Sequence, residues 1–124
     1  MAALPISGQA STYSDYFKGR LTSSGEVYSH AGYTAALLPK ARWYAVPLGT
    51  LVRLTYNGKV VVVKINDRGA GDGTMARVLD LSRAAYAYLI GKTVDSVTDA
   101  NAGVVQLSLI EIVPPGTAVG PVAS

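Results

Sequence analysis

The sequence predicts a small all-β domain, built as a closed barrel with one short α-helix. Three observations support this fold class. The chain has 124 residues, enough for one domain, and its 13 Gly and 6 Pro suit short strands and turns. Apolar residues alternate in several short runs, whereas one segment has helical spacing. The last predicted strand changes its apolar face partway, as strands do at bulges and barrel corners.

The expected domain covers residues 9–113, between a loose arm at 1–8 and a flexible, irregular tail at 114–124. Its strands are expected at residues 9–13, 33–38, 51–56, 59–65, 77–81 and 104–113. The pair Asn57-Gly58 favours a type I′ turn, so the two middle segments should form a hairpin. Residues 14–26 are rich in Gly, Ser, Thr and charge, which is typical of a functional surface loop.

The predicted helix begins after Ser82, a good N-cap, and ends near Gly91. Its apolar positions have the spacing of one helical face, which should pack on the sheet: Leu81, Ala84, Ala85, Tyr88 and Leu89. In the last strand Val105, Leu107 and Leu109 share one parity, whereas Ile110 and Ile112 have the other. The apolar side of this strand therefore changes between Leu109 and Ile110.

Composition narrows the classes of function. The net charge of +3 comes from basic residues dispersed along the chain, which favours weak attraction to acidic polymers and argues against nucleic-acid binding. Without cysteine, the chain has no disulfide or thiolate metal site. No apolar window is long enough to span a membrane. The N-terminus lacks the features of a secretory signal, so either a signal was trimmed or export follows another route, such as release of a phage particle by host lysis.

Two carboxylates are the candidates for chemistry. Glu26 lies in a polar loop with two glycines, and Asp67 follows the apolar run 60–63 and precedes Gly69. Such a pair could cleave a glycosidic bond, one group donating a proton and the other stabilising charge. Arg20 and Arg68 are expected to hold the carboxylates and to lower their pKa values. We expect Glu26 to be the acid, lying away from both arginines. The alternative is that Asp67 and Arg68 only stabilise a turn.

Other residues are candidates for substrate contact. Tyr13, Tyr28 and Trp43 could stack on sugars, as could Tyr16 and Tyr44, although core packing with a bonded hydroxyl explains a tyrosine equally well. Asp80 could line a groove beside Asp67, or it could pair with Arg68 or the backbone at the helix entrance.

His30 is the only histidine, and an exposed loop position is favoured over a chemical role. A lone histidine with dispersed carboxylates does not fit a zinc site, so neither a metal nor another cofactor is expected.

Several loop and strand segments form a series of specific motifs. The first motif is Ala10-Ser11-x-Tyr13-x-x-x-Phe17-x-Gly19-Arg20-x-Thr22-x-Ser24-Gly25-Glu26. The later motifs are Thr34-Ala35-Ala36, Leu38-Pro39, Pro47-Leu48-Gly49-Thr50, Val63-x-Ile65-Asn66-Asp67-Arg68-Gly69 and Leu79-Asp80-Leu81-Ser82-x-Ala84-Ala85. Together they cover roughly residues 10–113, and in content and order they resemble the motifs of the rare lipoprotein A family.

This resemblance implies a six-stranded double-psi β-barrel, related by fold to expansins and barwin-like proteins. It also implies a lytic transglycosylase that cuts the bond between N-acetylmuramic acid and N-acetylglucosamine and leaves a 1,6-anhydro end. Glu26 and Asp67 would be the catalytic carboxylates, and Arg20, Thr22 and Arg68 would belong to the substrate site. The chain departs from the family at Leu37, where a histidine is usual. It also departs through about four extra residues around 41–46, and at Lys18 and Ala70.

Two functions therefore remain open. The first, which the retention of both Glu26 and Asp67 favours, is a peptidoglycan-cleaving enzyme of the cell envelope, periplasm or extracellular space, acting on glycan strands and monomeric by default. The second is a non-catalytic wall-binding or phage virion module built on the same barrel, which the loss of the histidine favours.

Overall fold

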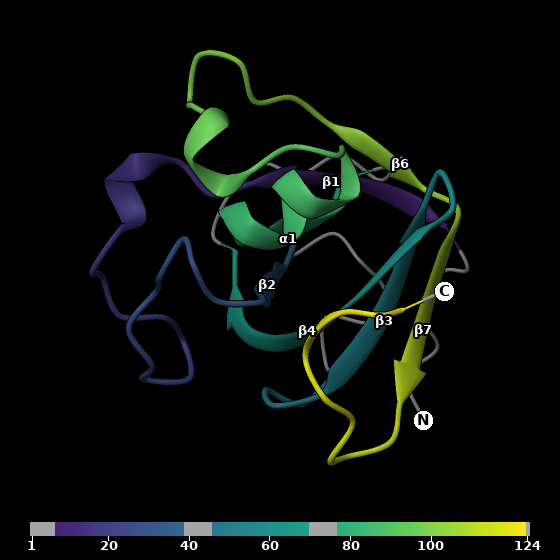
Figure 1. Cartoon of the computed structure of the whole chain (residues 1–124). Helices are drawn as coiled ribbons and strands as arrows, with labels where there is room; N and C mark the ends of the chain where they lie inside the picture. Colours follow the sequence, from purple (N-terminus) through teal and green to yellow (C-terminus); the bar gives the residue numbers. More distant parts are fainter. Residues whose placement is uncertain (1–6, 39–45, 70–76, 124) are drawn as a thin grey trace.

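The structure, a computed structural model, describes residues 7–38, 46–69 and 77–123. Strands dominate, with one short α-helix and two 3-10 turns (Figure 1). In chain order the elements are β1 (Gly8–Thr12), η1 (Asp15–Phe17), β2 (Thr34–Leu37), β3 (Leu51–Tyr56), β4 (Lys59–Arg68), β5 (Arg77–Leu81), α1 (Arg83–Leu89), η2 (Val94–Ser96), β6 (Val105–Leu107), β7 (Leu109–Val113) and β8 (Gly120–Pro121).

The sheet closes through one continuous stretch of chain. Its strand order is β6-β1-β5-β2-β4-β3-β7, and the two outermost strands, β6 and β7, are separated only by Ser108. The Ser108 N–H donates to the Thr55 carbonyl oxygen at 2.9 Å, which fixes this corner. With β6 and β7 counted as one bent strand, this path has the six strands predicted for the barrel, and the two-residue β8 adds to it by pairing with β4. The corner also explains the predicted change of face, since Leu107 and Ile110 are buried and Leu109 is exposed.

The predicted hairpin is confirmed. β3 and β4 pair from Tyr56↔Lys59 to Leu51↔Lys64, and Asn57 and Gly58 both have positive φ, 48° and 82°, as a type I′ turn requires. β4 is longer than expected, because it continues beyond Ile65 to Arg68. The extension pairs in parallel with β2, so the sequence Asn-Asp-Arg belongs to a strand and not to a turn.

A bulge in β4 determines which way Asp67 faces. In the pairing with β2, Ile65 lies opposite Ala35 and Asp67 lies opposite Ala36, which leaves Asn66 as an extra residue. Ile65 and Ala35 are both in the barrel core. The extra residue changes the strand's parity, so Asp67 joins the outer face next to Ala36.

Helix α1 packs across the barrel, where it contacts β4 and β1 (Figure 1). Its predicted ends are close to those observed, but its predicted buried face is only partly right. Ala85 and Leu89 are buried as expected, and so are Arg83, Tyr86 and Ala87. The reason is that α1 has seven residues and also packs against η2, so a second side is covered. Ser82 precedes the helix without a side-chain cap, and its hydroxyl donates to the Gly32 carbonyl oxygen at 2.7 Å.

The segment after Val113 differs from the expected flexible tail. Its strand β8 pairs with β4, opposite Val61 and Val62, and the Val122 N–H donates to the Val60 carbonyl oxygen at 2.9 Å. Gly120 makes this docking possible, since its φ is +111° and its backbone lies against the Tyr33 ring. Within the described residues, no helix has the length and apolar character needed to cross a bilayer.

Candidate active site

Asp67 is held by four hydrogen bonds. Its Oδ1 accepts from the Ser23 N–H at 2.8 Å, the Ser23 hydroxyl at 2.7 Å and the Arg68 N–H at 2.9 Å. Its Oδ2 accepts from the Tyr13 hydroxyl at 2.7 Å. Donors of this number and direction fix the orientation of the carboxylate. One lone pair on Oδ2 remains for another donor.

Glu26 is an exposed carboxylate paired with a lysine. Its Oε2 accepts from Lys64 Nζ at 2.7 Å, and its Oε1 accepts longer bonds, each of 3.3 Å, from Asn66 Nδ2 and the Ser24 hydroxyl. The side chain is 47% exposed. The Lys64 ammonium is the main cause that lowers the pKa of Glu26 below its usual range, with the bonds from Asn66 and Ser24 adding to the effect. Glu26 is therefore ionised at neutral pH.

One hairpin brings the two carboxylates together. We call residues 19–28 the Glu26 hairpin. The Tyr28 N–H donates to the Arg20 carbonyl oxygen and the Gly19 N–H to the Tyr28 carbonyl oxygen, which joins its two arms, and the Thr22 N–H donates to the Glu26 carbonyl oxygen at its turn. The turn docks on β4, where the Ser24 N–H donates to the Asn66 carbonyl oxygen at 3.1 Å. Thr22 is buried, with its hydroxyl bonded inside the turn.

Two consecutive serines of this turn each bind one of the two carboxylates. Ser23 binds Asp67, whereas Ser24 binds Glu26. The predicted carboxylate pair therefore lies on one side of the barrel, around the junction of the Glu26 hairpin with β4.

The partners of the carboxylates differ from those predicted. The Arg20 guanidinium donates to the Tyr16 carbonyl oxygen at 2.9 Å and lies over the Tyr16 ring, so it does not hold Glu26 or Asp67 as expected. Arg68 contributes its backbone N–H to Asp67, while its guanidinium donates to the Val46 carbonyl oxygen at 2.9 Å. Lys64 takes the role that had been expected of an arginine.

Tyr13 and Tyr28 follow the second of their two predicted roles: they pack inside with bonded hydroxyls and do not offer a surface for sugars. Both are buried, and their rings stack on each other with centroids 4.1 Å apart. Burial, followed by the bond to Asp67, raises the pKa of Tyr13, so its hydroxyl stays protonated as a donor. The exposed aromatic rings near the site are Tyr16 and Phe17, which precede the Glu26 hairpin. Trp43 and Tyr44 lie outside the described residues.

Asp80 lies in the same row of the sheet as Asp67. It faces Ala36 across the β5–β2 pair, and Ala36 faces Asp67 across the β2–β4 pair. At the usual spacing between strands, the two aspartates are roughly 10 Å apart along this row. The Ser11 hydroxyl donates to Asp80 Oδ1. Asp80 therefore borders the outer surface that carries Asp67, as one of its two predicted readings required.

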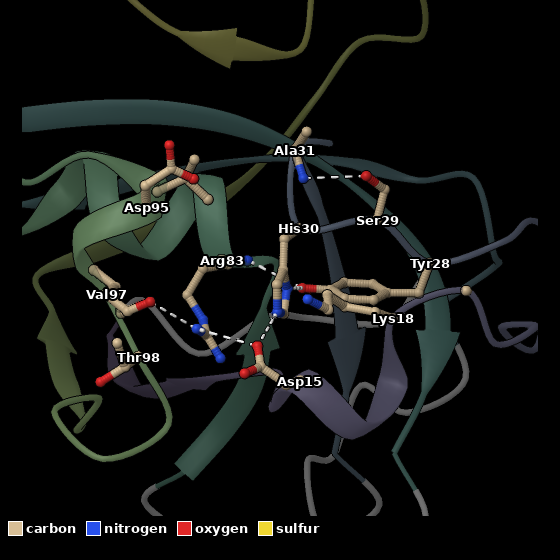
Figure 2. Close-up of a pocket in the computed structure, with 12 residues that line it drawn as sticks. Asp15, Lys18, Tyr28, Ser29, His30, Ala31, Arg83, Asp95, Val97 and Thr98 are labelled. Atoms are coloured by element: carbon tan, nitrogen blue, oxygen red, sulfur yellow. Dashed lines mark hydrogen bonds and ion pairs between the residues drawn. The ribbon is translucent and has the colours of Figure 1, made fainter.

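His30 is not an exposed loop residue, contrary to the prediction. Its side chain is 15% exposed, and it links the Tyr28 hydroxyl (2.7 Å from Nδ1) to the Asp15 carboxylate (2.9 Å from Nε2), as Figure 2 shows. The Tyr28 oxygen also accepts from the Arg83 N–H at 3.1 Å, so its own proton is free to point to Nδ1. The neutral ring then carries its proton on Nε2 and donates it to Asp15.

The position that differs from the family, Leu37, faces the barrel interior. Leu37 is fully buried in the core, at the level of Leu79 and Arg68 in the neighbouring strands. An aliphatic side chain fills this place without leaving a buried polar group unpaired. Among the described residues, no group of three or more acidic or histidine side chains could hold a metal ion.

Sequence reasoning missed Lys64, Ser23 and the support given by Tyr13. Lys64 carries a weak signal, because it is the polar residue that ends the apolar run of the hairpin strand. Ser23 and Tyr13 lie 44 and 54 positions from Asp67 in the sequence, respectively. No local sequence pattern predicts hydrogen bonds between residues so far apart.

The fold is a double-psi β-barrel. An expansin from Clavibacter michiganensis has a similar structure, with a TM-score of 0.61 and 22% sequence identity, over 91% of this chain and 52% of the expansin. A Streptomyces papain inhibitor matches with a TM-score of 0.61 and 24% identity, over 90% of this chain and all of the inhibitor. These two likenesses concern the fold.

The chain belongs to the lytic transglycolase family, whose profile matches residues 6–109. It is 41% identical over 104 residues to the probable endolytic peptidoglycan transglycosylase RlpA of Treponema pallidum, covering 82% of this chain and 28% of the relative. It is 46% identical over 86 residues to the endolytic peptidoglycan transglycosylase RlpA of Vibrio cholerae, covering 68% of this chain and 30% of the relative. The chain thus spans about a third or less of these relatives. The family predicted from the motifs is confirmed.

Proposed function

We propose that this domain cleaves the glycan strands of bacterial peptidoglycan as a lytic transglycosylase, in the cell envelope or outside the cell. The observation that carries the proposal is the paired attachment of Asp67 and Glu26 to Ser23 and Ser24. The family membership and the names of its relatives agree with this chemistry.

The two carboxylates are suited to different roles. Asp67 is held in one orientation by four hydrogen bonds, so its role is to stabilise the positive charge that develops at the anomeric carbon. Glu26 is exposed at a turn, so it can reach a substrate and exchange a proton with it. Protonated Glu26 donates its proton to the leaving glycosidic oxygen as the C–O bond breaks. The substrate's own 6-hydroxyl then attacks the anomeric carbon, and its proton returns to Glu26.

Lys64 sets a condition for the proton transfer from Glu26. Because it holds Glu26 ionised, Glu26 can act as an acid only after it has gained a proton, or after the substrate has weakened the Lys64 pair. We infer that activity is highest at acidic pH. Asp80, Arg68 and the exposed Tyr16 and Phe17 border the proposed path of the glycan.

The decisive experiment is digestion of purified sacculi, with mass spectrometry of the released fragments. Wild-type protein should release fragments with 1,6-anhydro ends, and Glu26→Gln and Asp67→Asn should each lower the release at least a hundredfold. Glu111→Gln is the matched control, since Glu111 pairs with Arg53 across β7 and β3. A well-folded wild-type protein that binds sacculi and releases no such fragments would refute the proposal. It would favour a wall-binding module instead.

A further inference from the structure

A cavity of about 530 Å³ lies at the base of the Glu26 hairpin. Its lining comes from the loop 15–19, the segment 28–31, Arg83 at the start of α1, and residues 94–98 around η2. Figure 2 shows Asp15, His30 and Arg83 clustered together in its lining, with Asp15 Oδ1 2.9 Å from His30 Nε2 and 3.7 Å from an Arg83 guanidinium nitrogen. Glu26 and Asp67 do not line this cavity, so it is separate from the carboxylate pair.

The back wall of the cavity is rigid. Arg83, whose side chain is 2% exposed, donates to the carbonyl oxygens of Val97 at 2.8 Å and Tyr13 at 2.7 Å, and to Asp99 Oδ1 at 2.7 Å. The chain of bonds from Tyr28 through His30 to Asp15 forms the adjoining wall. A preformed wall of this kind lowers the entropic cost of binding a ligand.

The charges at the rim favour a ligand without a strong charge of its own. Asp99 compensates the buried Arg83, so its guanidinium is not available as a free anion site. At the rim, Lys18 provides a cation, and Asp15 and Asp95 provide carboxylates, all three exposed. Carboxylates accept bonds from hydroxyl and amide protons, whereas an ammonium donates to hydroxyl and acetyl oxygens. Alternating acceptors and donors suit a polyhydroxylated ligand, and the volume is within the range of small-molecule sites.

We propose that this cavity binds a sugar residue of an N-acetylated glycan strand, as a subsite adjoining the Glu26 hairpin. The proposal rests on the function proposed above and names the part of the substrate that the cavity takes. One hairpin carries Glu26 near its tip and borders the cavity with Gly19 and Tyr28 at its base. A strand that lies along this hairpin therefore reaches both places.

The test uses chitohexaose, the hexamer of N-acetylglucosamine, and the Glu26→Gln variant of the full chain, followed by two-dimensional NMR of the backbone amides. Millimolar hexamer should shift the amides of Lys18, His30 and Thr98. Lys18→Met and Asp95→Ala, made in the same background, should each weaken the binding about fivefold, the effect of one lost hydrogen bond. Lys92→Met is the matched control, because Lys92 is exposed and does not line the cavity.

The results separate this subsite from the proposed function. If millimolar hexamer shifts none of the cavity amides, the subsite is refuted, even where wild-type protein releases anhydro fragments from sacculi. Tighter binding of the de-N-acetylated hexamer would also overturn it, since the cavity would then select a cation. Cavity shifts that Lys18→Met and Asp95→Ala weaken, in a protein that does not cleave sacculi, would keep the subsite and refute the transglycosylase.

Discussion

The Tyr13 hydroxyl donates a 2.7 Å hydrogen bond to Asp67 Oδ2, across 54 residues of sequence. Tyr13 is itself fixed: its ring stacks on Tyr28, its N–H donates to the Leu81 carbonyl oxygen, and its own carbonyl oxygen accepts from Arg83. The candidate carboxylate is therefore tied to the barrel through a tyrosine that the solvent does not reach. Under the proposed function, this contact makes Tyr13 a positioning residue for Asp67.

Removal of this hydroxyl should lower turnover more than binding. In Tyr13→Phe the ring stack is kept and Asp67 loses one of its four donors, at a cost of about 1.5–3 kcal/mol in the free energy of unfolding. We expect kcat for sacculus digestion to fall roughly tenfold, with KM little changed. Tyr56→Phe is the control, since Tyr56 lies beside the Asn57-Gly58 turn, at the other end of β4 from Asp67. Equal losses in both variants would contradict a positioning role for Tyr13.

Lys64 should set the pH range of activity. In Lys64→Met the main cause of the lowered pKa of Glu26 disappears, so the pKa rises towards its ordinary value. More Glu26 is then protonated at any pH above the lowered pKa. The falling limb of the profile of kcat/KM against pH should move to higher pH, with a several-fold gain near about pH 5. If the falling limb of the pH profile is at the same pH in Lys64→Met and wild type, Glu26 is not the proton donor.

Arg83 should be far more costly to replace than the exposed Arg53. Arg83→Met leaves the carbonyl oxygens of Tyr13 and Val97 without their donor, and we expect a loss of about 2–4 kcal/mol in the free energy of unfolding. Arg83→Lys should recover only part of it, because one ammonium cannot reach all three acceptors. Arg53→Met breaks an exposed pair with Glu111 and should cost less than about 1 kcal/mol. Denaturant titration measures all three variants, and equal losses in Arg83→Met and Arg53→Met would contradict the bracing role of Arg83.

Acid should weaken the wall formed by Asp15 and His30. The bond from His30 is the main cause that lowers the pKa of Asp15. A carboxylate with a lowered pKa contributes stability above its unfolded pKa, near about 3.9, and loses the contribution as the pH falls through the lowered value. The fall of Tm between about pH 4 and about pH 2 should therefore be smaller in Asp15→Asn than in wild type. Asp95→Asn is the control. Identical slopes in Asp15→Asn and wild type would contradict this coupling.

Patterns within single segments could be predicted from the sequence, whereas contacts between segments could not. Alternation and the Asn57-Gly58 turn were enough for the β3–β4 hairpin, and the motifs were enough for the family and for Glu26 and Asp67 as a pair. The partners of this pair depend on how the Glu26 hairpin docks on β4. That docking is a matter of tertiary register, for which a single sequence carries little information.

The burial of His30 was missed for the same reason, because it was judged by its own neighbours in the chain, where polar loop residues predominate. For Tyr13 and Tyr28, local sequence could not decide between stacking on sugars and packing in the core. The structure covers Tyr28 and His30 with Tyr13 and Arg83, which come from the end of β1 and the start of α1.

The bulge at Asn66 makes the proposed chemistry depend on a break in the alternation of β4. If the same residues followed regular alternation after Ile65, the side chain at 67 would point into the barrel, among aliphatic groups. A deletion of Asn66 would leave Asp67 directly after Ile65 and still on the outer face, but it would remove the carbonyl oxygen that accepts from Ser24 and the amide that donates to Glu26. The bulge therefore lets two consecutive residues of one strand serve the same carboxylate-bearing surface.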